Sequence, residues 1–129
     1  GLYTYFVGTG EPSWSYEVEP SCGDERSDRL RRCDSLYGFS ATPLSVDGAV
    51  LTGGLDGRLF IFNSDSGELL FEYDTAADFE TVNGVAASGA AIDAAGPVIV
   101  DGMVYVNSGY NGIVGRAGNV LLAFKVRGE

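Results

Sequence analysis

The feature that most constrains the fold of this 129-residue chain is an internal repeat. Residues 2–16 can be laid over residues 59–73 without a gap, and the first leucine, the glycine–glutamate pair and the last tyrosine coincide. A second overlap places residues 43–51 on residues 97–105 at an offset of 54. Self-similarity at this spacing is typical of solenoids and propellers, in which each unit buries its apolar face against the next.

Each repeat is predicted to consist of short antiparallel strands. Asp-Gly pairs at 47–48, 56–57 and 101–102 lie between apolar segments, and such pairs favour tight hairpin turns because both residues tolerate a positive φ. The strands predicted for the middle repeat are 40–46, 48–53, 58–63 and 68–74. The sequence therefore predicts an all-β fold of antiparallel four-stranded β-propeller blades, about two to three of them in a partial ring. An immunoglobulin-like sandwich is the alternative at this length, although it does not explain the repeat.

The predicted blades are unevenly distributed along the chain. The expected units are the outer strands of one blade (1–19), a cysteine-containing loop (20–38), a complete blade (39–75), and an insertion with most of a further blade (76–129). Three strands of that last blade are expected within residues 91–126. The polar run at 24–34 lacks an apolar face, so no helix is predicted there. Because the chain begins and ends inside predicted blades, we expect it to belong to a larger ring.

Four aromatic residues recur at matching repeat positions. Trp14 corresponds to Phe71, and Tyr16 corresponds to Tyr73. A recurrent aromatic residue on an outer strand is expected to pack between neighbouring blades and not to form a ligand platform.

Composition excludes several kinds of chemistry and partner. Eighteen acidic residues against eight basic ones give a net charge of −10, which argues against a nucleic-acid partner, since such partners need clustered cations. No apolar run approaches the roughly 18 residues of a membrane span. The chain contains no histidine, which excludes Ser-His-Asp catalysis, Cys-His catalysis and histidine-ligated zinc within it.

Several segments resemble a known family. Leu-Phe-Ile-Phe-Asn at 59–63, then Ser-Gly-Glu at 66–68 and an aromatic residue, are similar to the blade repeat of quinoprotein propellers of the pyrroloquinoline-quinone (PQQ) type. Residues 78–85, and residues 102–110 with 118–124, resemble the C-terminal part of polyvinyl-alcohol-dehydrogenase-like quinoproteins. Non-catalytic outer-membrane assembly lipoproteins share the blade repeat.

The resemblance implies PQQ, usually with calcium, at the centre of a seven- or eight-bladed ring that oxidises an alcohol in the periplasm or outside the cell. We expect this chain to be a fragment or subunit of such a ring, with no activity and no cofactor when alone. Its partners would be other propeller blades, from sister chains or a longer polypeptide. The alternatives are a non-catalytic propeller module, used for protein binding or as a structural building block, and a free-standing binding domain.

Four polar residues around the innermost strand of the last predicted blade are candidates for a site. Asp78 and Asp93 are candidate catalytic residues, because a carboxylate there could act as general base on an alcohol. Asn83 and Arg116 are candidate cofactor-binding residues, because an arginine could hold a quinone carboxylate. The alternative is that Asp and Asn cap turns while Arg116 pairs with a surface acid.

The two cysteines, Cys22 and Cys33, lie in the loop at 20–38. In a family exported to oxidising compartments they are expected to form a disulfide, the alternatives being free thiols or half of a metal site. The surrounding arginines and acids are expected to form a solvated, self-neutralising loop, or else a partner-binding loop. These arginines are Arg26, Arg29, Arg31 and Arg32.

A possible metal loop lies at residues 63–68. Its alternating oxygen-bearing residues and glycine resemble the start of a calcium loop. The equivalent positions near the N-terminus would not bind calcium, so a hairpin turn is favoured and no metal ligand is predicted.

Overall fold

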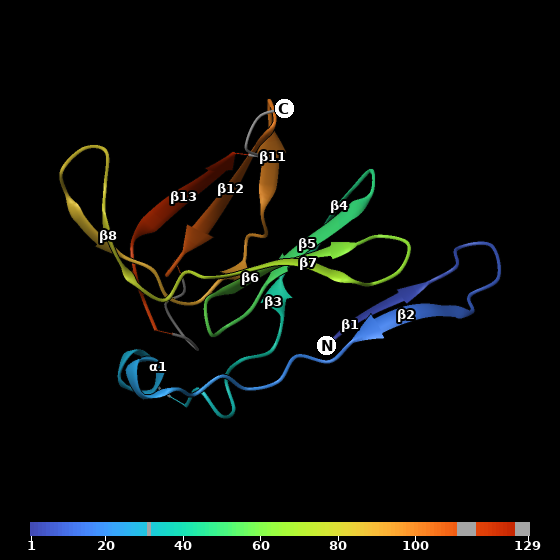
Figure 1. Cartoon of the computed structure of the whole chain (residues 1–129), viewed down its shortest axis with the longest axis horizontal. Coiled ribbons are helices and arrows are strands. Elements are labelled where there is room, and N and C mark those ends of the chain that lie inside the picture. The colour runs from blue at the N-terminus through green and yellow to red at the C-terminus, as the bar shows by residue number, and fades with distance from the viewer. Residues whose placement is uncertain (31, 111–115, 126–129) are drawn as a thin grey trace.

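The computed structural model describes residues 1–30, 32–110 and 116–125, and almost all of its regular structure is β (Figure 1). The elements are β1 (Leu2–Tyr5), β2 (Pro12–Tyr16), α1 (Asp24–Arg29), β3 (Ser40–Ala41), β4 (Leu44–Val46), β5 (Ala49–Gly53), β6 (Arg58–Asn63), β7 (Leu69–Asp74), β8 (Asp78–Glu80), β9 (Ala86–Ser88), β10 (Asp93–Ala94), β11 (Val98–Val100), β12 (Met103–Ser108) and β13 (Val120–Lys125). The predicted all-β class is confirmed, and the separate antiparallel sheets are consistent with partial propeller blades. Predictions for residues 31, 111–115 and 126–129 lie outside the described residues.

The predicted four-stranded antiparallel sheet is present, in the order β4-β5-β6-β7. Its first two connections contain the expected Asp-Gly pairs, and Gly48 and Gly57 have φ values of 81° and 83°, where glycine is favoured. The first strand begins at Leu44 and not at residue 40, because Pro43 has no N–H to continue a ladder. The separate strand β3 pairs in parallel with β10.

The sheet β11-β12-β13 repeats the register of this sheet. Val50 of β5 is opposite Phe62 of β6, and Val104 of β12 is opposite Phe124 of β13. Val50 and Val104 are 54 residues apart, which is the offset of the sequence overlap. The sequence repeat therefore corresponds to a repeat of strand pairing.

Aromatic residues of β2 pack on the neighbouring four-stranded sheet. The ring of Phe62 lies 5.9 Å from that of Trp14 and 4.8 Å from that of Tyr16. The indole N–H of Trp14 also donates to the carbonyl of Ser64 at 2.8 Å.

The equivalent residues of β7 pack on the next sheet along the chain. The ring of Phe124 lies 6.2 Å from that of Phe71 and 5.1 Å from that of Tyr73. Since Phe124 has the register position of Phe62, the same aromatic contact occurs twice. The prediction that these residues pack between neighbouring units is confirmed.

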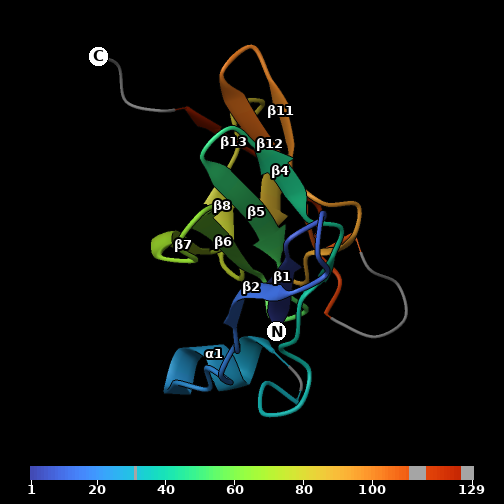
Figure 2. The ribbon, with the colours of Figure 1, turned by 90° about the vertical axis from the view of Figure 1, so that its right-hand side faces the viewer.

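The loop at 20–38 contains the predicted disulfide but also a helix that was not predicted. Cys22 and Cys33 form the expected disulfide, with their Cα atoms 5.6 Å apart. Between them lies the short helix α1, at one end of the molecule below the sheets (Figure 2). The prediction of no helix was wrong because hydrophobic periodicity detects only helices with an apolar face, whereas α1 directs arginines toward acidic partners.

Candidate functional site

Three segments meet at the end of the molecule that carries α1. Asp78 begins β8, and its Oδ2 atom lies 3.3 Å from Nη2 of Arg29 in α1. Arg116 donates from Nη1 to the backbone carbonyl of Arg29 at 2.6 Å. Together with Glu25 and Asp28, these residues line an open hollow of about 470 Å³. The structure thus brings two of the four candidate residues, Asp78 and Arg116, to one hollow.

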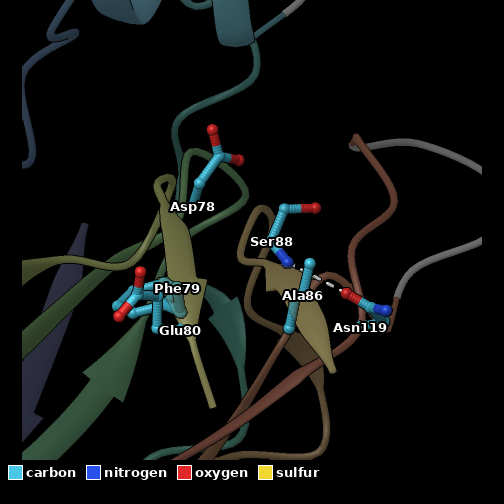
Figure 3. Close-up of a pocket in the computed structure, with 7 residues that line it drawn as sticks. Asp78, Phe79, Glu80, Ala86, Ser88 and Asn119 are labelled. Carbon is cyan, nitrogen blue, oxygen red and sulfur yellow. Dashed lines mark hydrogen bonds between the residues drawn. The ribbon is translucent and has the colours of Figure 1, made fainter. Parts of the chain in front are cut away.

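A second hollow, also of about 470 Å³, adjoins the β8–β9 hairpin and shares Asp78 (Figure 3). The residues lining it are Asp78, Phe79, Glu80, Ala86, Ala87, Ser88 and Asn119. The side chain of Asn119 accepts a hydrogen bond from the backbone N–H of Ser88 at 2.9 Å, as the dashed line shows. This bond attaches the hairpin to the start of β13.

The other two candidates lie elsewhere. Asn83 is exposed in the turn of the β8–β9 hairpin, where its Oδ1 atom accepts from Thr81 Oγ1 and from the N–H of Val85. Asp93 lies in β10, where its Oδ1 atom accepts from the hydroxyl of Ser40 and from the N–H of Ala94. Asn83 stabilises a turn, and Asp93 stabilises the β3–β10 pair.

The calcium-like segment is a hairpin turn, as favoured from the sequence. Oδ1 of Asn63 accepts from the N–H groups of Asp65 and Ser66, each at 2.9 Å, which is the pattern of an Asx turn. Within the described ranges, no three Cys, Asp or Glu side chains gather as metal ligands would.

Sequence reasoning missed a buried ion cluster around Asp56. The side chain of Asp56 is fully buried, and its Oδ2 atom lies 2.6 Å from Nε of Arg58 and 3.1 Å from Nη2 of Arg26. Arg26 also pairs with Asp74, and Arg58 pairs with Glu72 at 3.3 Å. A buried charge needs such partners because its desolvation is costly.

The cluster corrects the prediction of a fully solvated loop. The side chain of Arg26 is only 13% exposed, because it extends from α1 to the β5–β6 turn and also donates to the backbone carbonyl of Asp56 at 2.9 Å. Arg29, by contrast, is 35% exposed. The one sequence signal for the cluster was the Asp-Gly pair at 56–57. A hairpin turn alone accounts for this pair, so it did not indicate that Asp56 is buried.

The chemistry available around Asp78 is that of open, polar hydrogen bonding. Carboxylates, guanidinium groups, an amide and a serine line the two hollows. Such groups can bind hydroxyl compounds through paired donors and acceptors. In the part of the chain that the structure describes, no helix has the length and apolar character needed to cross a membrane.

Comparisons with known proteins identify two proteins of similar sequence. No protein-family model matches the sequence, and no solved structure matches it. The chain is 44% identical over 142 aligned residues to a polyvinylalcohol dehydrogenase of Pseudomonas sp, and 32% identical to one of Sphingopyxis sp. (strain 113P3). Each alignment covers all of this chain but 21% of the relative. The chain is therefore similar over its whole length to about a fifth of two polyvinylalcohol dehydrogenases.

Proposed function

We propose that this chain is part of a quinoprotein-type β-propeller whose complete assembly oxidises polyvinyl alcohol or a similar alcohol with PQQ. The observation that carries the proposal is the 44% identity of the whole chain to the Pseudomonas polyvinylalcohol dehydrogenase. The shared register of β5–β6 and β12–β13 supports a propeller, because blades are copies of one sheet. The disulfide supports a periplasmic or extracellular location, where disulfides persist.

The hollow around Asp78 does not by itself fit PQQ, which carries carboxylates. Glu25, Asp28 and Asp78 oppose Arg29 and Arg116 there, and Arg29 is already paired with Asp78. Calcium takes six to eight oxygen ligands, and the described residues contain no acidic cluster that could hold an ion. We therefore propose that other parts of the assembly supply most ligands of the quinone and calcium.

The roles proposed for individual residues in the complete assembly are those suggested by the sequence. Asp78 and Asp93 are proposed as catalytic carboxylates that act as general base, and Asn83 and Arg116 as cofactor contacts. Among these four, Asp78 and Arg116 are the stronger pair because they line one hollow.

A chimera tests the proposed function. This chain would replace the matching fifth of the Pseudomonas enzyme, and dye-linked oxidation of polyvinyl alcohol would be measured with added PQQ and calcium. We expect turnover. Asp78→Asn and Arg116→Gln should lower it, whereas Asp65→Asn, in the exposed turn at the far end of β6, should not. A folded, quinone-loaded chimera without turnover would contradict the proposal.

The chain alone is predicted not to oxidise alcohols. The purified 129-residue protein, given PQQ and calcium, should leave both the alcohol and the quinone absorbance unchanged. Reproducible turnover would show that the proposed need for further blades is wrong.

The proposed partners are other blades, from sister chains or a longer polypeptide. All residues of β7 and β11 are exposed, and exposed apolar edge strands favour strand addition by another chain. Light scattering should therefore give a species larger than 13.6 kDa. A monodisperse, cooperatively folded monomer would contradict this expectation.

A non-catalytic module is the second candidate function. The observation that favours it is that both candidate acids already make contacts within the chain, Asp78 with Arg29 and Asp93 with Ser40. Under this hypothesis the chimera would fold and bind quinone, but Asp78→Asn would leave turnover unchanged.

A further inference from the structure

The disulfide and the buried ion cluster join the same two parts of the molecule. Arg26 belongs to the segment that Cys22 and Cys33 close, and its guanidinium pairs with Asp56 in the turn between β5 and β6. We propose that Cys22 is a site of thiol–disulfide exchange with a dithiol reductant or its oxidised form, and that exchange there controls the pairing of Arg26 with Asp56. This inference is independent of the proposed dehydrogenase function.

The two cysteine residues differ in their exposure. Cys22 is an exposed residue, whereas Cys33 is 8% exposed and packs with Leu30 and Ala76. An attacking thiolate needs access to the sulfur that it attacks. Cys22 is therefore the entry point for exchange, and Cys33 is the leaving group.

The exchange balances with a dithiol as the two-electron reductant. One thiolate of the reductant bonds to the Cys22 sulfur while the Cys22–Cys33 bond breaks, and Cys33 leaves as a thiolate that takes up a proton. The second thiol of the reductant then attacks the mixed disulfide and releases Cys22 as a thiol. The reductant leaves as a disulfide, and the protein gains two thiols.

Reduction removes the covalent constraint on the segment that carries Arg26. With the disulfide intact, the segment carrying α1 is a closed loop; once reduced, it gains conformational freedom that docking must remove. Asp56 is fully buried, so loss of Arg26 would leave its carboxylate with Arg58 as its remaining ion-pair partner among the described residues. Reduction is thus unfavourable for the turn at 54–57 as well as for the loop.

Thermodynamic linkage makes the coupling reciprocal. If the disulfide supports the Arg26–Asp56 pair, then the pair must hold the two sulfurs together and oppose reduction. Weakening the pair should consequently shift the thiol–disulfide equilibrium toward the thiols, even though Arg26 touches neither cysteine in any described contact.

The equilibrium with reduced and oxidised dithiothreitol tests the proposal. The fraction of thiol would be trapped by alkylation and measured by mass spectrometry for the wild type, Arg26→Gln and the matched control Arg29→Gln. We expect Arg26→Gln to shift the equilibrium constant about tenfold toward the thiols, as for a lost charged hydrogen bond. Arg29→Gln, which removes an exposed pair, should shift it less than about threefold. Equal shifts, or none, would overturn the proposal.

A second measurement reads the coupling in the opposite direction. The N–H of Arg58 donates to Oδ1 of Asp56 at 3.2 Å, so its hydrogen exchange reports on the cluster. Reduction, or Cys22→Ser, should speed exchange at Arg58 about tenfold while leaving Leu51 in β5 protected. Fluorescence of Trp14, in a separate hairpin, would verify that each variant is folded. Unchanged exchange at Arg58 in a folded, reduced protein would also overturn the proposal.

Discussion

The two contacts between successive sheets use the same aromatic positions but bury them differently. In the first contact, Trp14 and Tyr16 are half-buried and lie against Phe62, which is fully buried. In the second, Phe71 and Tyr73 are exposed, and the Phe124 ring against which they lie is only half-buried. Sequence position alone therefore does not determine how much apolar surface such a contact removes from water.

Neighbouring strands explain the difference. Phe62 lies in β6, which has β5 on one side and β7 on the other, whereas β13 is at the edge of the three-stranded sheet. Near the second contact, the buried apolar residues are the aliphatic side chains of Leu59, Ile92 and Val106, against which Phe124 packs. An aromatic pair between sheets becomes a core only when a further strand covers its edge.

Truncating the two equivalent phenylalanines should give the largest difference in stability between the two contacts. Phe62→Ala should lower the free energy of unfolding by about 3–5 kcal/mol, because a buried ring is replaced by a cavity. Phe124→Ala should cost about 1–2 kcal/mol, because its half-buried ring has less surface to lose. Urea unfolding at one protein concentration, followed by circular dichroism, measures both. Equal losses would show that β13 is covered in solution.

The polar part of the second contact should have a smaller effect. The hydroxyl of Ser108 accepts from the N–H of Ala90 at 2.8 Å and lies 2.7 Å from the hydroxyl of Thr75. Ser108→Ala leaves the buried N–H of Ala90 without this partner and should lower the free energy of unfolding by about 1–3 kcal/mol.

The matched control for this prediction is Ser66→Ala. Its hydroxyl accepts a hydrogen bond from the N–H of Glu68 in an exposed turn, so the change should cost less than about 0.5 kcal/mol in the same urea titration. If the two serine variants unfold alike, the buried hydroxyl network contributes nothing to the second contact.

The smallest effect concerns the hairpin that makes the first contact. The hydroxyl of Tyr3 donates to Glu17, and this hydrogen bond and the charge of Glu17 raise the pKa of Tyr3 above its ordinary value. Because the pKa is higher in the folded state, the stabilisation is fully present below the unfolded pKa of about 10 and is lost as the pH rises through the folded value.

Tyrosine-resolved NMR titration would measure this shift. Glu17→Gln should return the pKa of Tyr3 toward its ordinary value. An unchanged pKa of Tyr3 in the variant would show that the hydrogen bond between Tyr3 and Glu17 does not form in solution. Tyr3 is exposed, so the effect on unfolding should be slight.

The sequence predicted the parts of the molecule that follow local rules. Alternating apolar residues and Asp-Gly turns located the β4–β7 sheet, and the repeat located the aromatic contacts. The alternation did not locate the start of β4, which begins at Leu44, after Pro43, and not at the predicted residue 40.

The parts that sequence reasoning missed depend on distant partners. Arg26 and Asp56 are thirty residues apart, and no periodicity links an arginine in a polar run to a buried turn. The four site candidates flank the predicted innermost strand of the last blade, but the β8–β9 hairpin places Asn83 in its turn, and Asp93 lies in β10, which pairs with β3. A residue-type pattern gives candidate acids but cannot predict how far apart they lie in the fold.

The shared register also shows where chain length can vary without disturbing the sheets. β5 and β12 are related by an offset of 54, whereas Phe62 and Phe124 are 62 residues apart, so the second copy accommodates eight additional residues between its paired strands. The N–H of Gly118 donates to the carbonyl of Gly109 at 2.7 Å, so these two described residues of the connection between β12 and β13 are hydrogen-bonded to each other. Residues inserted between two hydrogen-bonded glycines do not shift the register of β12 and β13. The entropic cost of closing the loop rises only slowly with its length. New recognition elements can therefore be acquired at this end of the fold, while the Asp-Gly turns at 47–48 and 101–102, at the opposite ends of the strands, preserve the strand alignment.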